Sequence, residues 1–169
     1  MQSIKKFIFH WPHFVYGILW LLLFTYCIKM NFFVQHWVWF FAFPVILPWF
    51  EWLVHKYVLH ANCPTKDGLR RRFMLRLHYR HHENPNSFHD IFAPIWLILP
   101  TWFVIAALTY FISASSAISY IVALSVLTTY LFYEWTHYLY HSDMTPWGHY
   151  RQHMKKAHLW HHYKNENYW

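Results

Sequence analysis

The sequence predicts an all-α integral membrane protein with about four transmembrane helices and a cytosolic helical cap. The first observation is composition: 57% of the residues are hydrophobic, 24% are aromatic and only 12% are charged, unlike a soluble domain. The second is that the apolar residues gather into four stretches near the roughly 20 residues that a spanning helix needs. A soluble all-helical core is the alternative. With 169 residues, the chain has room for one domain and no appended module.

The four apolar stretches cover residues 14–28, 32–54, 91–112 and 117–133. The third has the length of a spanning helix, whereas the first must borrow flanking residues such as Trp11 and Pro12. Pro44 and Pro48 interrupt the second stretch and predict a kink. Membrane helices tolerate such prolines when neighbouring groups satisfy the freed carbonyls.

Lysine and arginine placement predicts the orientation. Lys5 and Lys6 precede the first stretch, seven basic residues lie at 56–80, and more follow the fourth stretch, but only Lys29 falls on the other side. By the positive-inside rule, both termini and the central loop face the cytoplasm. The absence of a cleavable signal or retrieval motif favours a bacterial inner membrane over the endoplasmic reticulum. Because these basic residues border spans, the net charge of +7 indicates contact with anionic lipid and no nucleic acid.

Histidine patterning predicts the site. Ten of the 16 histidines form two near-identical sets, each a spaced pair, then a gap of 17 or 18 positions, then an HxxHH triplet. The first set is His55, His60, His78, His81 and His82, and the second is His137, His141, His158, His161 and His162. Since one ion rarely takes more than six ligands, ten imidazoles indicate two metals side by side.

Helix geometry predicts how these side chains converge. Residues at i, i+3 and i+4 share a face, so each triplet can converge on one point. His55 and His60 differ, because five residues leave them about 140° apart on an ideal helix. Either that helix is irregular or the two serve different metals. Glu51-Trp52 and Glu134-Trp135 precede the two pairs and suggest a duplicated unit.

A purely structural role does not suit these ten histidines, because protonated imidazoles on one face repel one another and no carboxylates are placed to neutralise them. Five others, by contrast, are expected to be interfacial anchors: His10, His13, His36, His149 and His153. Imidazole binds iron, zinc, copper and nickel alike. A long chain entering from the bilayer, however, presents unactivated C–H bonds, for which redox-active iron and O₂ are the available tools.

These four histidine motifs resemble those of the membrane-bound fatty acid hydroxylase and sterol desaturase superfamily. The resemblance covers 44–169, leaving 1–43 as an N-terminal segment with the first span. Residues 133–141 and 158–165 especially resemble the fatty acid 2-hydroxylase branch, while 51–60 also resembles carotenoid β-ring hydroxylases. Relatives continue past the last triplet with a glycine-containing segment, so we expect a chain truncated at its C-terminus.

The resemblance implies a four-span base and a cytosolic cap in which the ten patterned histidines hold two iron ions, with zinc able to replace iron in purified protein. It implies an O₂-dependent lipid hydroxylase, with fatty acyl groups preferred over sterols or carotenoids and desaturation as a variant. Electrons would come from a separate cytochrome b5, ferredoxin or reductase, since the chain has no heme-binding or dinucleotide-binding signature of its own. Glu51, Glu134 and Asp90 are candidates for orienting the imidazoles.

Two alternatives come from other protein classes. A histidine-rich metal transporter would place histidines or acidic residues near mid-bilayer, and the predicted spans are nearly free of them. A bis-histidine heme protein would need facing histidines deep in the bundle, which the sequence does not supply.

Overall fold

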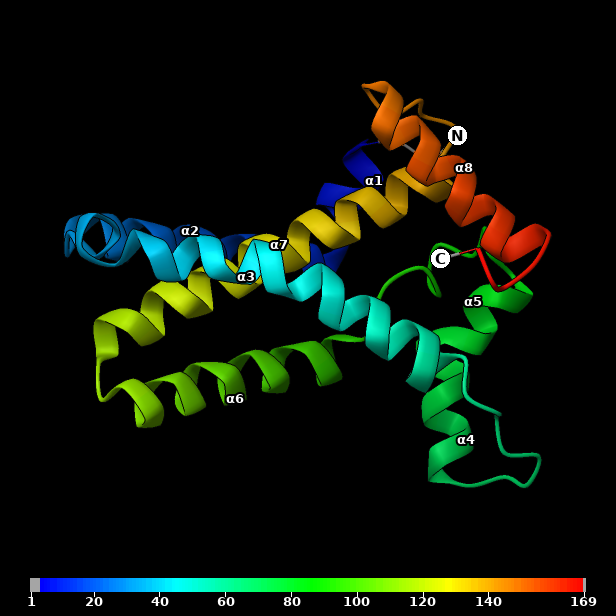
Figure 1. The fold of residues 1–169 in the computed structure, drawn as a ribbon, viewed down its shortest axis with the longest axis horizontal. Helices are drawn as coiled ribbons and strands as arrows, with labels where there is room; N and C mark the ends of the chain where they lie inside the picture. The colour runs from blue at the N-terminus through cyan, green and yellow to red at the C-terminus, as the bar shows by residue number, and fades with distance from the viewer. Residues whose placement is uncertain (1–3, 169) are drawn as a thin grey trace. The chain divides into compact units, whose positions relative to one another are not determined.

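The computed structural model describes residues 4–168, and these residues form helices joined by loops, with no strand among them (Figure 1). The helices, in chain order, are α1 (Ile4–Ile8), α2 (Trp11–Lys29), α3 (Phe32–Val54), η1 (His55–Leu59), α4 (Leu69–Met74), η2 (Leu75–Tyr79), α5 (Arg80–Glu83), α6 (Ile95–Ser113), α7 (Ser116–His141) and α8 (His149–Tyr163). They divide into two compact units, one of residues 50–93 and 134–168 and the other of residues 4–49 and 94–133. We call these the histidine unit and the apolar unit.

Four helices are long and apolar enough to cross a membrane: α2, α3 continued by η1, α6 and α7. This confirms the all-α membrane fold class. The first begins at Trp11, as the borrowing of flanking residues predicted, and α3 has the predicted bounds. The third begins at Ile95 rather than residue 91, because the residue before Pro94 is disfavoured in a helix. The fourth continues to His141 rather than 133, since no glycine or proline stops it.

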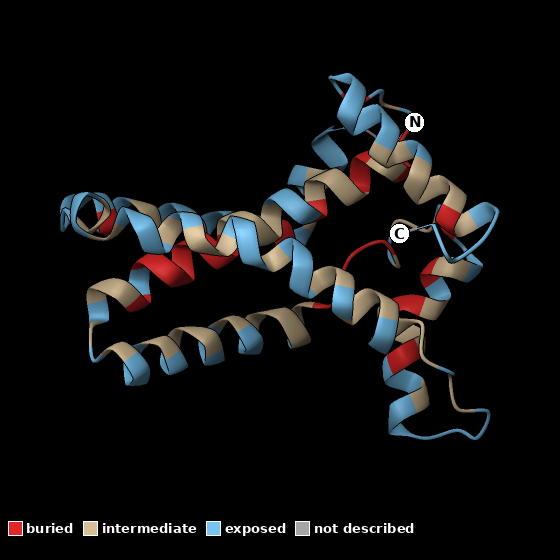
Figure 2. Ribbon diagram, viewed as in Figure 1, coloured by how far each residue is buried: buried red, intermediate tan, exposed pale blue. Residues whose placement is uncertain are grey.

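Helix α7 supplies most of the buried surface of the apolar unit. Its residues Ile121 and Leu124 are fully buried and pack with Cys27 of α2, under a layer of aromatic side chains from α2 and α3. Figure 2 shows buried residues concentrated along this part of α7, while α3 and α6 are mainly half-buried or exposed. Phe111 is 78% exposed and Ile112 is 86% exposed. Such outer faces suit contact with acyl chains.

The carbonyl freed by Pro44 of α3 is compensated as expected. Pro44 has no N–H to donate to the carbonyl of Phe40, four residues earlier. The hydroxyl of Ser125, on α7, donates to that carbonyl at 2.5 Å. The non-helical backbone angles within α3 lie at His36 and not at Pro44 or Pro48, so the prediction of a kink at the prolines is wrong. A proline whose freed carbonyl finds another donor fits a membrane helix without breaking it.

The histidine unit is tied together by polar contacts between its short elements. The hydroxyl of Tyr79 donates to the carbonyl of Ala61 at 2.6 Å. The ammonium of Lys155, on α8, donates to the carbonyls of Ser142 and Met144 at 2.5 and 2.9 Å, at the C-terminal end of α7. These contacts fix α8 against the turn after α7, and α8 and α7 together carry five of the ten patterned histidines.

Candidate metal centre

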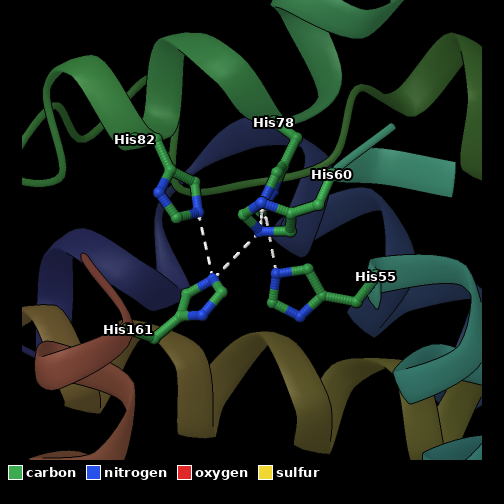
Figure 3. Close-up of side chains that lie close together, drawn as sticks. All are labelled: His55, His60, His78, His82 and His161. Carbon is green, nitrogen blue, oxygen red and sulfur yellow. Dashed lines mark hydrogen bonds between the residues drawn. The ribbon is translucent and has the colours of Figure 1, made fainter. Parts of the chain in front are cut away.

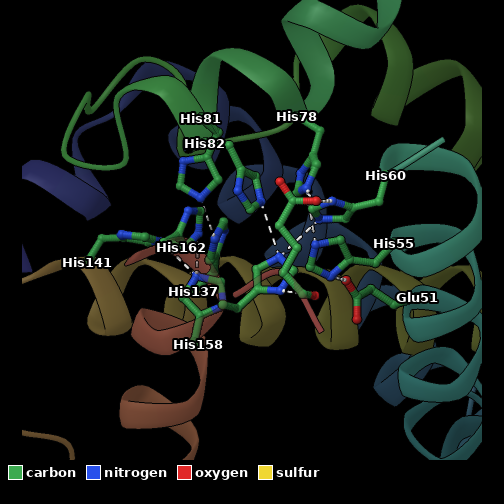
Figure 4. A network of polar contacts seen from close by, with 12 residues as sticks. Glu51, His55, His60, His78, His81, His82, His137, His141, His158 and His162 are labelled. Carbon is green, nitrogen blue, oxygen red and sulfur yellow. Dashed lines mark hydrogen bonds and ion pairs between the residues drawn. The ribbon is translucent and has the colours of Figure 1, made fainter. Parts of the chain in front are cut away.

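All ten patterned histidines lie in the histidine unit, where they form two groups of five. Group A, shown in Figure 3, contains His55, His60, His78, His82 and His161. Group B contains His81, His137, His141, His158 and His162. Within each group the candidate ligand nitrogens lie within 4.8 Å of one another. The groups adjoin, since the rings of His82 and His162 are 4.2 Å apart (Figure 4).

A π-helical turn resolves the odd pair. Residues His55–Leu59 form η1, and the N–H of His60 donates to the carbonyl of His55, five residues back, at 3.1 Å. This wider turn brings residues five apart onto one side, whereas an ideal α-helix would separate them by about 140°. The two rings are 5.0 Å apart and both belong to group A. The first of the two sequence-based alternatives, an irregular helix, is the one that the structure contains.

The expectation that each triplet converges on one point is wrong. His78 and His82 join group A, with ring centres 4.4 Å apart, but His81 joins group B. The reason is angular: residues four apart lie about 40° apart around a helix, whereas neighbouring residues lie about 100° apart. An HxxHH triplet therefore points its i and i+4 side chains at one centre and its i+3 side chain at another.

The second triplet divides in the same way, with the two groups exchanged. His158 and His162 belong to group B, with ring centres 4.7 Å apart, and His161 crosses to group A. Each triplet thus gives two histidines to the group that contains its own spaced pair and one to the other group. The two halves of the motif are interlocked, because each group takes four histidines from one half and one from the other.

The distances between Nε2 atoms within each group fit one metal ion bound by several histidines of that group. The Nε2 atom of His60 lies 2.8 Å from that of His78 and 3.0 Å from that of His161. In group B the Nε2 atoms of His141 and His158 are 2.7 Å apart. Two nitrogens at right angles, each about 2.1 Å from one ion, would be about 3.0 Å apart.

Tautomers give an independent test of this fit. The Nδ1 atom of His60 faces a carboxylate oxygen of Glu166 at 3.1 Å, and the Nδ1 atom of His161 faces the backbone carbonyl of Glu166 at 2.9 Å. Both oxygens only accept, so both Nδ1 atoms must carry the proton, and in a neutral imidazole the Nε2 atom is then a bare lone pair. Two lone pairs 3.0 Å apart cannot hydrogen-bond to each other. A cation between them fits this arrangement.

Burial keeps these imidazoles neutral. Desolvation, followed by repulsion from neighbouring histidines, lowers the pKa of His81, His82 and His162 to about 2. The same causes lower the pKa of His78 and His158 far below the usual range. Neutral imidazole is the form that binds a metal. The imidazole nitrogens of both groups can therefore bind a metal ion at neutral pH.

The three carboxylates expected to orient the imidazoles have different partners. Glu51 lies 3.6 Å from the Nδ1 atom of His55. Asp90 accepts from Ser87 at 2.6 Å and lies 3.2 Å from exposed His89, and both of these residues are outside the two groups. Glu134 is buried and accepts the backbone N–H of Ala93 at 3.3 Å.

Glu166 is the residue that sequence reasoning missed. It is the one acidic residue after Asp143, four positions beyond the last histidine, and that isolation was the available signal. The remaining six histidines lie outside both groups: His10, His13, His36, His89, His149 and His153. Among them His13 is buried and stacks on Phe7, so it packs inside the apolar unit rather than anchoring an interface.

Fold and site together define a class: all-α proteins with four membrane-length helices and two adjoining sets of five histidines. The model of the fatty acid hydroxylase family matches residues 40–169, and the chain belongs to this family. It is also similar to a fatty acid 2-hydroxylase of Rattus norvegicus, at 26% identity over 117 residues, or 68% of this chain. The chain spans 30% of the length of that relative. No solved structure matches the chain.

Proposed function

We propose that the protein is a membrane-bound non-heme di-iron oxygenase that hydroxylates a lipid chain, with fatty acyl groups as the preferred substrates. The observation that carries the proposal is the pair of adjoining five-histidine groups whose nitrogens converge. Membership of the fatty acid hydroxylase family and similarity to a protein named fatty acid 2-hydroxylase support the reaction and the substrate class. A sterol or carotenoid substrate is the alternative within the same superfamily.

The ten histidines would hold two iron ions, one in each group. Bound iron supplies the redox chemistry by which O₂ attacks an unactivated C–H bond, a reaction that amino acid side chains cannot perform. Five imidazoles are one fewer than the six ligands of an octahedral ion. An ion held by all five imidazoles of a group would therefore have room for one further small ligand. Zinc would occupy the same imidazoles without supplying redox chemistry.

The protein's own residues contribute neutrality, orientation and exclusion of water. Burial holds the imidazoles of His81 and His158 neutral, so that their lone pairs are available. Glu166 directs the Nε2 atoms of His60 and His161 inward. Four of the patterned histidines, His78, His81, His141 and His161, are buried, which limits the access of bulk water to their nitrogens. Such exclusion prevents reactive species from being lost to side reactions.

The proposal includes the membrane setting and the electron supply. In it, the histidine unit is a cytosolic cap, because the basic residues of 56–80 and 151–164 border the spans. A bacterial inner membrane is our preferred location. Electrons come from a separate cytochrome b5, ferredoxin or reductase. Exposed Arg70 of α4 is available to an acidic carrier or to lipid headgroups, whereas Arg72 is paired with Asp67 at 2.7 Å.

Lipid analysis under ¹⁸O₂ tests the proposal. Cells expressing the protein should contain a fatty acyl product heavier by one oxygen atom and labelled from the gas. His158→Ala should abolish the product, because His158 is a group B histidine. His153→Ala, on the same helix but exposed and outside both groups, is the matched control and should retain it.

The other outcomes separate the alternatives. A labelled sterol or carotenoid would move the substrate class within the superfamily. Changed cellular metal content without any oxygenated lipid would refute the hydroxylase and favour a transporter.

A further inference from the structure

The segment after α8 folds back onto that helix and holds Glu166 in place. The N–H of Asn165 donates to the carbonyl of Trp160 at 3.0 Å, and the N–H of Tyr168 donates to the carbonyl of Asn165 at 3.1 Å. The ring of Tyr168 packs against that of Trp160, with centres 5.1 Å apart. Residues 164–168 therefore form a compact turn and not an extended tail.

Glu166 accepts hydrogen bonds from two histidines of group A through two different groups of its own. Its side-chain carboxylate accepts from the Nδ1 atom of His60, which follows η1, and its backbone carbonyl accepts from the Nδ1 atom of His161, on α8. His60 and His161 are 101 residues apart, and their Nε2 atoms are 3.0 Å apart in group A. One residue thus sets the tautomers of two ligands that come from opposite ends of the histidine unit.

Group B has no comparable arrangement in the part of the chain that the structure describes. The Nδ1 atoms of His81, His141 and His162 are buried there without a hydrogen-bond partner. In group A the Nδ1 atom of His60 therefore faces a carboxylate and that of His161 a backbone carbonyl, whereas three of the five Nδ1 atoms in group B have no partner. A carboxylate on the far nitrogen makes the ligating nitrogen more basic and fixes the ring orientation.

We infer that Glu166 is a positioning residue for the metal of group A alone, so that the two metal sites differ in affinity and depend on different parts of the chain. The inference deepens the proposed function, since it requires that the groups bind metal. Removal of such a partner from a ligating histidine weakens metal binding by about 10–100-fold. The effect should fall on one metal per chain.

The test is chelator competition on purified full-length protein loaded with cobalt(II), with metal release and the residual metal content measured together. Glu166→Ala removes the contact to His60 but keeps the backbone carbonyl to His161. One of the two cobalt ions should then bind about 10–100-fold more weakly in the competition, with the other unchanged. Glu166→Gln keeps an oxygen acceptor without the charge and should fall between the wild type and Glu166→Ala.

Two controls separate positioning from folding. Glu83→Ala removes an exposed carboxylate that directly follows His82, and Asn167→Ala changes the neighbour of Glu166. Both should release cobalt as the wild type does. Thermal melting of the metal-free Glu166→Gln variant should match that of the metal-free wild type, because the exposed charge contributes little to the fold itself.

The outcomes distinguish this inference from the proposed function. If Glu166→Ala released both cobalt ions as the wild type does, the inference would be overturned and the hydroxylase proposal would stand. Equal weakening of both ions, with a lowered melting temperature, would also overturn it, by showing a general structural role. A wild-type protein that binds no cobalt, iron or zinc would refute the metal centre itself.

Discussion

Acidification should destabilise the metal-free histidine unit, because its buried imidazoles resist protonation. The pKa of His81, His82 and His162 is lowered to about 2 by desolvation and by neighbouring histidines, against a usual 6.5. Below pH 6.5 the unfolded chain binds protons that the folded chain does not. Stability is therefore complete above pH 6.5 and falls as the pH drops from 6.5 toward 2. Each histidine contributes about 1.4 kcal/mol per pH unit, so these three give about 4 kcal/mol per unit.

Denaturant titration of the metal-free protein in detergent, followed by circular dichroism at pH 7.5, 6.5, 6.0 and 5.5, measures this slope. His162→Gln should reduce the slope by about 1.4 kcal/mol per unit, since glutamine does not titrate. Metal loading should move the loss of stability to lower pH, because a bound ion stabilises the folded state. A free energy of unfolding that stays constant between pH 7 and 5.5, or a slope unchanged in His162→Gln, would show that the folded histidine unit does not exclude protons from these imidazoles.

Two further substitutions test contacts that hold the site and its support. Ser125→Ala should lower the free energy of unfolding by about 1 kcal/mol in denaturant titration, because the Phe40 carbonyl freed by Pro44 loses its donor; an unchanged value would show that the carbonyl finds another partner. Lys155→Met keeps the aliphatic stem but leaves the carbonyls of Ser142 and Met144 without the ammonium, so limited proteolysis should cut residues 142–148 faster. Wild-type cleavage rates would contradict that role.

The membrane helices were predictable because length and apolarity alone decide them. The bounds of α3 match the prediction, and α2 begins where the need for more length placed it. The errors fell where local chemistry outweighs hydropathy. Pro94 delays the start of α6, and the polar but helix-compatible run from Glu134 extends α7 to His141.

The gathering of the ten patterned histidines was also predictable, because they form two repeated sets at helical spacing. Their division between two centres was not, since the same-face rule treats i+3 and i+4 as equivalent neighbours. His81 and His82 reach different centres because neighbouring residues lie about 100° apart around a helix. The π-turn at His55–Leu59 has no sequence signature that distinguishes it from an α-helix. The position of Glu166 at the site was not predictable either, because it depends on a turn after α8 that no sequence periodicity indicates.

If the two interlocked histidine groups hold two irons, protein purified from iron-supplemented cells should contain two irons per chain. His161→Ala should lose metal, because that residue belongs to group A, and His36→Ala should retain it fully, because His36 lies outside both groups. A wild-type stoichiometry of one iron per chain, or full metal retention by His161→Ala, would show that the two groups do not form two iron sites.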